Sequence, residues 1–146
     1  MQTFLPFPCF NSSVKALDNK RLGKQRVEGK QILDILENRS PSSRWRNHPA
    51  VKMWRGYENA LKFYINCCIE EWTSRTNEDG VYFKNTMEVY AISKPIEYPW
   101  WFGKEKFHEA HRSNLLRKDY SFYSKYCWQE PTNLPYIWPE GKQKGK

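Results

Sequence analysis

Three polar residues that could do chemistry interrupt an otherwise apolar helical face near the start of the chain. At 100° per residue, Arg21, Gln25 and Glu28 fall on the same stripe as a set of apolar side chains. That set consists of Val14, Leu17, Ile32, Ile35 and Leu36. A buried charge without a partner is too costly to keep, so these polar residues either form a satisfied network or line a cleft. Helix geometry alone also allows a simple ion pair between Arg21 and Glu28 in the core.

Cations surround this stripe. Lys20, Lys24, Arg26 and Lys30 lie close to Glu28 in the sequence and are of the kind that bind a phosphate backbone. A carboxylate in a basic cleft is a candidate acid or charge stabiliser with a pKa shifted by its environment. The chain has 24 Lys and Arg against 16 Asp and Glu, the balance expected of a protein that binds a polyanion. A soluble protein with a Lys-rich surface has the same balance.

A second group of polar residues precedes Pro49, which suits the first turn of a helix. Asn47 and His48 would lie at the positive end of that helix, where free backbone N–H groups favour an anion such as phosphate. His48 could equally act as a plain helix cap. Arg46, next to them, would flank the same cleft.

The third group lies between residues 108 and 126. His108 and His111 have a spacing that could share a metal, but they lack Cys or Asp partners at ligand spacing, so we expect neither metal nor cofactor. Arg112 and Lys118 extend the basic surface. The rings of this segment, Tyr120, Phe122, Tyr123 and Tyr126, offer stacking platforms for bases. Packing of the same rings onto the core is the alternative.

The elements that must position these residues are mainly helical. We predict an all-α fold with three helices, the first from the capping cluster at residues 11–13 to about Glu37. Breakers at Asn38, Ser40, Pro41, Ser42 and Ser43 separate it from a second helix that starts at Pro49 and closes at residues 77–80. The third helix is expected from about Lys104 to Lys118. Trp54, Tyr57, Leu61, Tyr64, Cys68 and Trp72 define the buried face of the second helix.

The rest of the chain is expected to be irregular. Pro6 and Pro8 predict an extended segment over residues 1–10 that packs onto the body. Residues 81–103 should form an aromatic-rich connection, and residues 138–146 a frayed Lys-rich tail. The length of 146 residues predicts a single domain, residues 1–146. We expect a monomer.

The first residues lack the pattern of a secretory signal, and no stretch is apolar enough to span a membrane. The four cysteines show no C-x-x-C spacing, so we expect reduced, mostly buried thiols. These features predict a soluble, cytoplasmic protein without a membrane partner.

Three segments together resemble a known family. They are LDNKRLGKQRVEGKQIL (residues 17–33), RWRNHPAVKMWRGYENAL (44–61) and FHEAHRSNLLRKDYSFYSKY (107–126). In this order they are similar to the pyrimidine-dimer DNA glycosylase family, and they resemble its bacterial branches more closely than its phage branch. One departure is the order Arg26-Val27-Glu28, where the family commonly has an aromatic residue and then Arg before its Glu.

The resemblance implies a compact all-helical enzyme that binds double-stranded DNA, flips a nucleotide and excises cyclobutane pyrimidine dimers. It places Glu28 as the catalytic carboxylate and the α-amino group of Met1 as the nucleophile, with AP lyase activity through a Schiff base. Such chemistry suits these groups, because a carboxylate stabilises an oxocarbenium-like sugar and an amine attacking C1′ forms an imine. Gln2 is too large for ordinary removal of Met1, so the Met1 amine should be retained.

Two alternatives to this function remain from the sequence, a non-catalytic nucleic-acid-binding module and a glycosylase for a different modified base. The DNA contacts that we expect come from the residues above and from the aromatic segment, which the resemblance places near the lesion. They are Arg21, Lys24, Gln25, Arg26, Arg46, Asn47, His48, His111, Arg112, Lys118, Tyr123 and Tyr126.

Overall fold

A computed structural model describes residues 1–39 and 44–142 of the chain. Within these residues it has six α-helices and no strand, so the all-α prediction is confirmed, and one isolated antiparallel bridge joins Thr76 and Tyr82. The predicted breakers at residues 40–43 lie outside the described part. The helices are α1 (Phe10–Ala16), α2 (Asn19–Leu36), α3 (Pro49–Trp54), α4 (Glu58–Ser74), α5 (Glu105–Lys118) and α6 (Tyr120–Tyr123), followed by the 3₁₀ turn η1 (Ser124–Tyr126).

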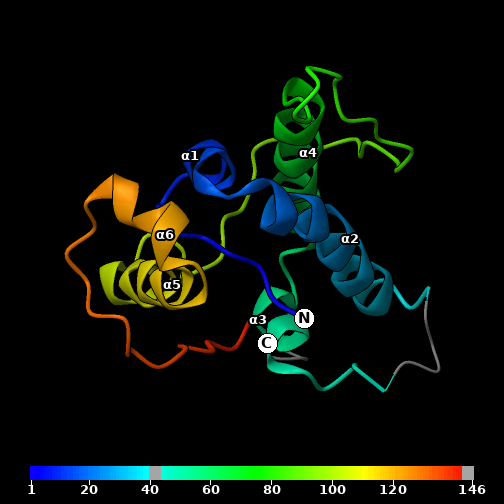
Figure 1. Cartoon of the computed structure of the whole chain (residues 1–146). Helices are drawn as coiled ribbons and strands as arrows, with labels where there is room; N and C mark the ends of the chain where they lie inside the picture. The colour runs from blue at the N-terminus through cyan, green and yellow to red at the C-terminus, as the bar shows by residue number, and fades with distance from the viewer. Residues whose placement is uncertain (40–43, 143–146) are drawn as a thin grey trace.

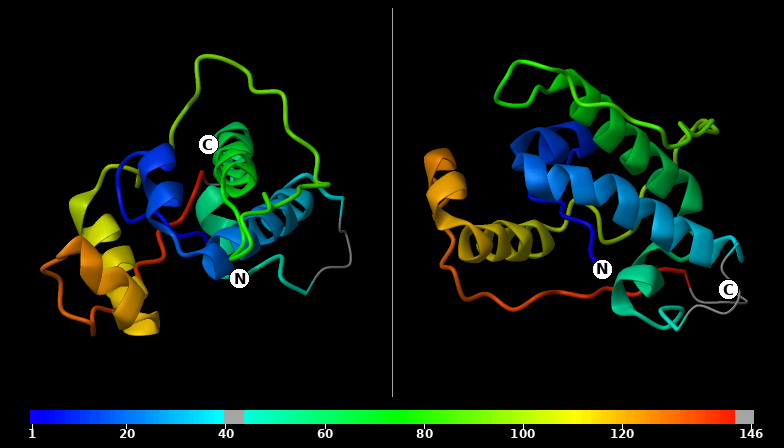
Figure 2. Two further views of the ribbon diagram at one scale, coloured as in Figure 1. Left: turned by 45° about the horizontal axis from the view of Figure 1, so that its top comes forward. Right: turned by 45° about the vertical axis from the view of Figure 1, so that its right-hand side comes forward.

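The long helices α2 and α4 form the centre of the fold, and they lie side by side in both Figure 1 and Figure 2. Gly29 permits their close approach, because a Cβ atom there would lie 2.8 Å from Cγ1 of Ile65. The core between them contains Leu22, Ile32 and Leu61, all fully buried. Helices α5 and α6 lie to one side of this pair, and the first residues of the chain run between the two groups (Figure 2).

The first predicted helix is divided into α1 and α2, so the expectation of one continuous helix is wrong. Leu17 is extended, and Asp18 caps α2 by accepting a hydrogen bond from the Arg21 backbone N–H. Nor does the cluster at residues 11–13 cap the helix, because α1 starts at Phe10 after Cys9, whose side chain makes no capping bond.

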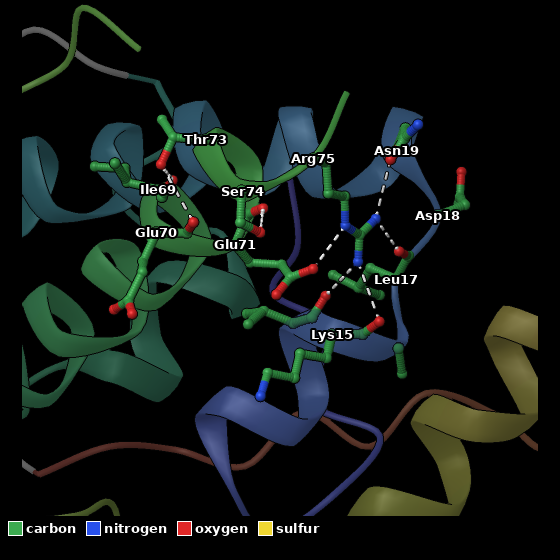
Figure 3. Close-up of polar contacts among 12 residues, drawn as sticks. Lys15, Leu17, Asp18, Asn19, Ile69, Glu70, Glu71, Thr73, Ser74 and Arg75 are labelled. Carbon is green, nitrogen blue, oxygen red and sulfur yellow. Dashed lines mark hydrogen bonds and ion pairs between the residues drawn. The ribbon is translucent and has the colours of Figure 1, made fainter. Parts of the chain in front are cut away.

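The Arg75 side chain holds this break in place (Figure 3). Its guanidinium group donates to the carbonyl oxygens of Val14, Lys15 and Leu17, to Oδ1 of Asn19 and to Oε2 of Glu71. All five N–H donors of the group are therefore used. Three of these bonds go to carbonyls at the C-terminal end of α1, of which that of Val14 also accepts the Leu17 N–H.

The second predicted helix is also divided, because Gly56 interrupts it between α3 and α4 with a φ of +86°. Residues with a side chain rarely adopt this conformation, so glycine ends α3 here. A Cβ atom at Gly56 would also lie 2.6 Å from Cβ of Lys142, where the C-terminal tail crosses the helix junction. The predicted apolar face survives the break, since of its six members only Trp72 is partly exposed.

The tail beyond residue 138 makes hydrogen bonds through its backbone as far as the structure describes it. Gly141 donates its N–H to the Lys52 carbonyl at 3.0 Å, and Lys142 donates to the Arg55 carbonyl at 2.8 Å. The Trp100 indole donates to the Glu140 carbonyl at 2.7 Å. These bonds join residues 140–142 to α3 and to Trp100, the fraying of the tail stays a prediction, and residues 143–146 lie outside the described part.

Two further expectations concern the burial of the cysteine side chains and the presence of a helix that could span a membrane. Cys67 and Cys68 are buried free thiols, whereas Cys9 and Cys127 are exposed, so the expected burial is wrong for the second pair. Among the helices of residues 1–39 and 44–142, none is long and apolar enough to cross a membrane.

Candidate active site

One pocket brings the start of the chain to the polar stripe of α2. It has a volume of about 240 Å³, and its wall includes Met1 and Glu28 together with cations from two helices. The lining residues are Met1, Gln2, Phe4, Lys20, Arg21, Lys24, Gln25, Glu28 and Lys118. Six residues that the sequence singled out, Met1, Arg21, Lys24, Gln25, Glu28 and Lys118, therefore share one pocket.

The N-terminal segment is not helical before Phe10, as predicted, although the chain bends at residues 6–9, and its first part passes through the core. Thr3, Phe4 and Leu5 are almost fully buried, although they precede the first helix. Side chains from α5 and α3 bind the backbone of Leu5 and the side chain of Thr3. Leu5 donates its N–H to Nδ1 of His111 at 3.0 Å, and the Trp54 indole donates to Oγ1 of Thr3 at 3.0 Å. These bonds fix the direction in which the amino terminus enters the pocket.

Gln25 connects this segment to Glu28. Its Nε2 donates to Oε2 of Glu28 at 3.0 Å and to the carbonyl of Gln2 at 2.9 Å. Its Oε1 accepts from the Phe4 backbone N–H at 2.9 Å and from the Tyr64 hydroxyl at 2.6 Å. The Gln25 side chain is 1% exposed, so it positions other groups and does not itself reach DNA.

The Glu28 carboxylate lies in a partly desolvated position. Burial raises the pKa of Glu28 above its usual value, because the pocket wall replaces water around the charged form. The chain's amino terminus, Lys24 and Lys118 act in the opposite direction. A carboxyl group with a raised pKa beside an amine is suited to proton transfer and to stabilising positive charge on a sugar.

The alternative of an ion pair between Arg21 and Glu28 in the core is not seen, because Arg21 pairs with other carboxylates. Its guanidinium donates to Oδ1 of Asp18 at 3.2 Å and lies 4.0 Å from Oδ2 of Asp119. Lys24 and Lys118 are exposed at the pocket rim, where they could meet phosphate groups. Lys20, which borders the same pocket, was recognised in the sequence as a cation near the stripe but not as a site residue.

Four predicted DNA contacts lie outside this pocket. The Arg26 guanidinium lies 4.7 Å from the centroid of the Trp72 ring and donates to Asn85 Oδ1 at 2.7 Å. Arg46 donates to Asn38 Oδ1 at 3.1 Å, and Asn47 is exposed beside it. His48 acts as a cap, because its Nδ1 accepts from the Ala50 N–H at 3.0 Å. Burial lowers the pKa of His48, and the positive amino terminus lowers it further.

Three other predicted contacts are buried. His111 accepts a bond from Leu5, and Arg112 binds Glu105, Glu130 and the Pro6 carbonyl. Tyr123 is completely buried and its hydroxyl donates to Asp18 Oδ1. In this structure the polar groups of His111, Arg112 and Tyr123 are thus buried and bound to other parts of the protein, and their contact with DNA stays a prediction. They hold the N-terminal segment and the start of α2.

Tyr126 is half-buried, and its hydroxyl donates to the Ala16 carbonyl at 3.0 Å. His108 is buried and is bound to backbone atoms on both sides, with Nδ1 lying 2.7 Å from the Leu5 carbonyl oxygen and Nε2 accepting from Gly103. In the described part of the chain, no three His, Cys, Asp or Glu residues cluster as metal ligands would.

Sequence reasoning missed Tyr64 and Trp54 as parts of the site. Both belong to the apolar face of α3 and α4, and their polar atoms bind Gln25 and Thr3 from that face. A Tyr and a Trp at buried positions each need a hydrogen-bond partner, which is the signal that could have indicated them.

A basic, all-α protein whose pocket combines a carboxylate with several cations is suited to bind a polyanion such as nucleic acid. The sequence model of the family described as pyrimidine dimer DNA glycosylase matches residues 1–89, more than half of the chain. The chain belongs to this family and is therefore a DNA glycosylase of DNA repair. No curated protein and no solved structure matches it. Lys118, Tyr123 and Tyr126 lie beyond the matched residues.

Proposed function

We propose that this protein excises cyclobutane pyrimidine dimers from double-stranded DNA and then cuts the strand, with the Met1 amine as nucleophile and Glu28 as the essential carboxylate. The observation that carries the proposal is the pocket shared by Met1 and Glu28. The hydrogen bonds of Gln25 to Gln2 and to Glu28 fix the two groups relative to each other. Lys24 and Lys118 supply the charge that phosphates require.

The steps balance without a cofactor. The unprotonated Met1 amine attacks C1′ of the damaged nucleotide, and the bond between C1′ and the base nitrogen breaks, with its electron pair leaving on the base. Glu28 stabilises the positive charge that develops on the sugar, and the sugar ring opens to give an imine between Met1 and C1′. Removal of a proton from C2′ then expels the 3′ phosphate by β-elimination, and water releases the amine.

The raised pKa of Glu28 supports its role in these proton transfers, because a carboxyl group that holds a proton more tightly can return it to the leaving group. A cytoplasmic location and a monomeric state remain part of the proposal.

The test is strand scission of an end-labelled duplex that carries one thymine dimer, with and without alkali. Wild-type protein should cut the damaged duplex without alkali, and borohydride should trap a covalent complex through the imine. Glu28→Gln should abolish both products and retain DNA binding, because the neutral amide keeps the shape of the side chain. Intact mass spectrometry is the check on whether the protein carries Met1 with a free amine, which the proposal requires.

Scission that requires alkali would show excision without the lyase step. Binding without excision in the wild type would favour the non-catalytic module, and excision of another modified base from a substrate panel would favour a different lesion. As a matched control, Glu70→Gln removes an exposed carboxylate from α4 and should cut like the wild type.

A further inference from the structure

Four aromatic rings form a continuous row between the start of α3 and the C-terminal tail. His48 lies edge-on to Trp45, with 5.5 Å between ring centroids, and edge-on to Trp138, with 6.0 Å. Trp138 in turn stacks on Tyr136, with a centroid distance of 5.4 Å and an interplanar angle of 29°. We call Trp45, His48, Trp138 and Tyr136 the aromatic row.

A cation lies at each end of the aromatic row. The Arg44 guanidinium is 5.5 Å from the centroid of the Trp45 ring, and the Arg117 guanidinium is 5.8 Å from that of Tyr136. Rings that alternate with cations bind single-stranded nucleic acid elsewhere, because bases stack on the rings while the cations meet phosphates. The row therefore combines ring faces, on which a base could stack, with positive charge at both ends, which favours the phosphates of a DNA strand.

Two of the four rings, the large apolar side chains of Trp45 and Trp138, are exposed, whereas His48 and Tyr136 are partly buried. The exposed fraction is 43% for Trp45 and 38% for Trp138. Neighbouring exposed apolar side chains commonly mark a binding site. The row is also preformed, because Arg117 donates to the Thr132 carbonyl and Gly141 donates to the Lys52 carbonyl, on either side of Tyr136 and Trp138.

The position of the row connects it to the candidate active site. Helix α3 and the N-terminus lie next to each other in Figure 1 and in both views of Figure 2. The positive amino terminus acts electrostatically on His48, a member of the row. A nucleotide whose sugar reaches the amine must leave the duplex, and its neighbours lose part of their stacking. A platform beside the amine would replace that stacking.

We propose that the aromatic row binds a nucleobase that has left the helical stack, with Trp45 and Trp138 supplying the stacking surfaces and Arg44 and Arg117 the phosphate contacts. This inference rests on the proposed function only in taking DNA as the ligand. Half of the residues in this proposed binding site lie outside the segment that matches the family, because Arg117, Tyr136 and Trp138 come after residue 89.

The test measures binding of a fluorescently labelled undamaged duplex that carries one unpaired thymine, in comparison with the fully paired duplex, at one fixed salt concentration. The wild-type protein should prefer the duplex with the unpaired base. Trp138→Ala and Trp45→Ala should each weaken binding of that duplex by roughly 5- to 100-fold, the loss expected for one stacked base. Both should leave binding of the paired duplex nearly unchanged.

Two further variants separate stacking from general damage to the fold. Trp138→Phe keeps an aromatic face and should retain most of the preference. Tyr82→Ala removes a ring that is 65% exposed but lies outside the row, and it should retain all of it. The proposal is overturned if the wild type does not discriminate between the two duplexes, if Trp138→Ala keeps the preference, or if Tyr82→Ala loses as much.

Excision of a thymine dimer, measured in parallel, distinguishes this inference from the proposed function. If the protein prefers the unpaired base through Trp138 but excises no dimer, the role of the aromatic row is supported and the proposed function is contradicted. If the protein excises dimers but Trp138→Ala binds both duplexes like the wild type, the proposed function is supported and the role of the aromatic row is contradicted.

Discussion

The Gln25 side-chain amide donates to the Glu28 carboxylate at 3.0 Å, and its oxygen accepts the backbone N–H of Phe4 at 2.9 Å. One buried side chain therefore sets the position of the carboxylate relative to the segment that carries the amino terminus. A change at Gln25 should act on the chemistry through this geometry, since a displacement of about 1 Å can cost roughly 100-fold in rate.

Gln25→Glu should lower the rate of dimer excision by roughly 10- to 100-fold. The substitution keeps the size of the side chain but places a second carboxylate beside Glu28 and the Gln2 carbonyl. Two neighbouring carboxylates raise the pKa of one of them, so the acidic limb of the pH–rate profile should move to higher pH. Single-turnover excision over a range of pH values tests this.

Gln31→Glu is the matched control for this prediction. Gln31 lies on the same helix with its side chain exposed, and the substitution makes the same change of charge. The role of Gln25 would be contradicted if both variants had the same pH–rate profile as the wild type.

Glu28→Gln should raise the thermal unfolding midpoint at pH 8, although it removes activity. Burial raises the pKa of Glu28, so above that pKa the folded protein carries a charge that is better solvated in the unfolded chain. The glutamine carries no such charge. Below the ordinary glutamate pKa of about 4.3, both states of the wild type are protonated and the difference should disappear.

Calorimetry of wild type and Glu28→Gln at pH 8 and pH 4 provides the measurement for Glu28. Equal midpoints at pH 8 would mean that the nearby cations offset the cost of burial.

Stability should fall with acid through His111. Burial lowers the pKa of His111 to about 3, whereas in the unfolded chain the value is near 6.5. Between these values the unfolded chain binds a proton that the folded protein cannot, so folding free energy is lost as pH falls from about 6.5 towards 3. The loss approaches 1.4 kcal/mol per pH unit for one such group, on the order expected from linkage.

Urea unfolding of wild type and His111→Gln from pH 7.5 to pH 4 tests the role of His111. The variant should be less stable at pH 7.5, because Leu5 loses a well-placed acceptor, but its stability should depend less steeply on pH. His48→Gln, at a partly exposed position, should keep most of the wild-type slope. A slope unchanged in His111→Gln would contradict the assignment.

Arg75→Met should destabilise the fold by about 2 kcal/mol or more, which for a chain of this size lowers the unfolding midpoint by roughly 5 °C. The variant keeps much of the aliphatic stem but removes every donor to the end of α1 and to Glu71 (Figure 3). Arg39→Met is the control, because Arg39 is half-exposed and pairs with Glu37 at the surface. Such a pair contributes little, so equal losses in the two variants would contradict this account.

The fold class and much of the candidate site were accessible from local patterns. Periodicity of three and four residues predicted the buried face from Trp54 to Trp72, and the two prolines predicted the extended start. Arg21, Gln25 and Glu28 stood out because polar side chains on an apolar stripe are costly. Each of these signals depends on residues within a few positions of one another.

Long-range contacts decided the rest. The break at Leu17 and Asp18 depends on Arg75, more than fifty positions away, and Gly56 is crossed by Lys142 from the tail. Whether a polar side chain is buried or reaches DNA depends on what covers it.

His111, Arg112 and Tyr123 showed this most clearly, since their types suited DNA contact but the N-terminal segment and Asp18 occupy their polar groups. The sequence by itself determined the helical class and which residues are suited to the chemistry. Only the tertiary structure decided which of them face one pocket, because burial and partner choice are properties of segments that meet in space and not of neighbours along the chain.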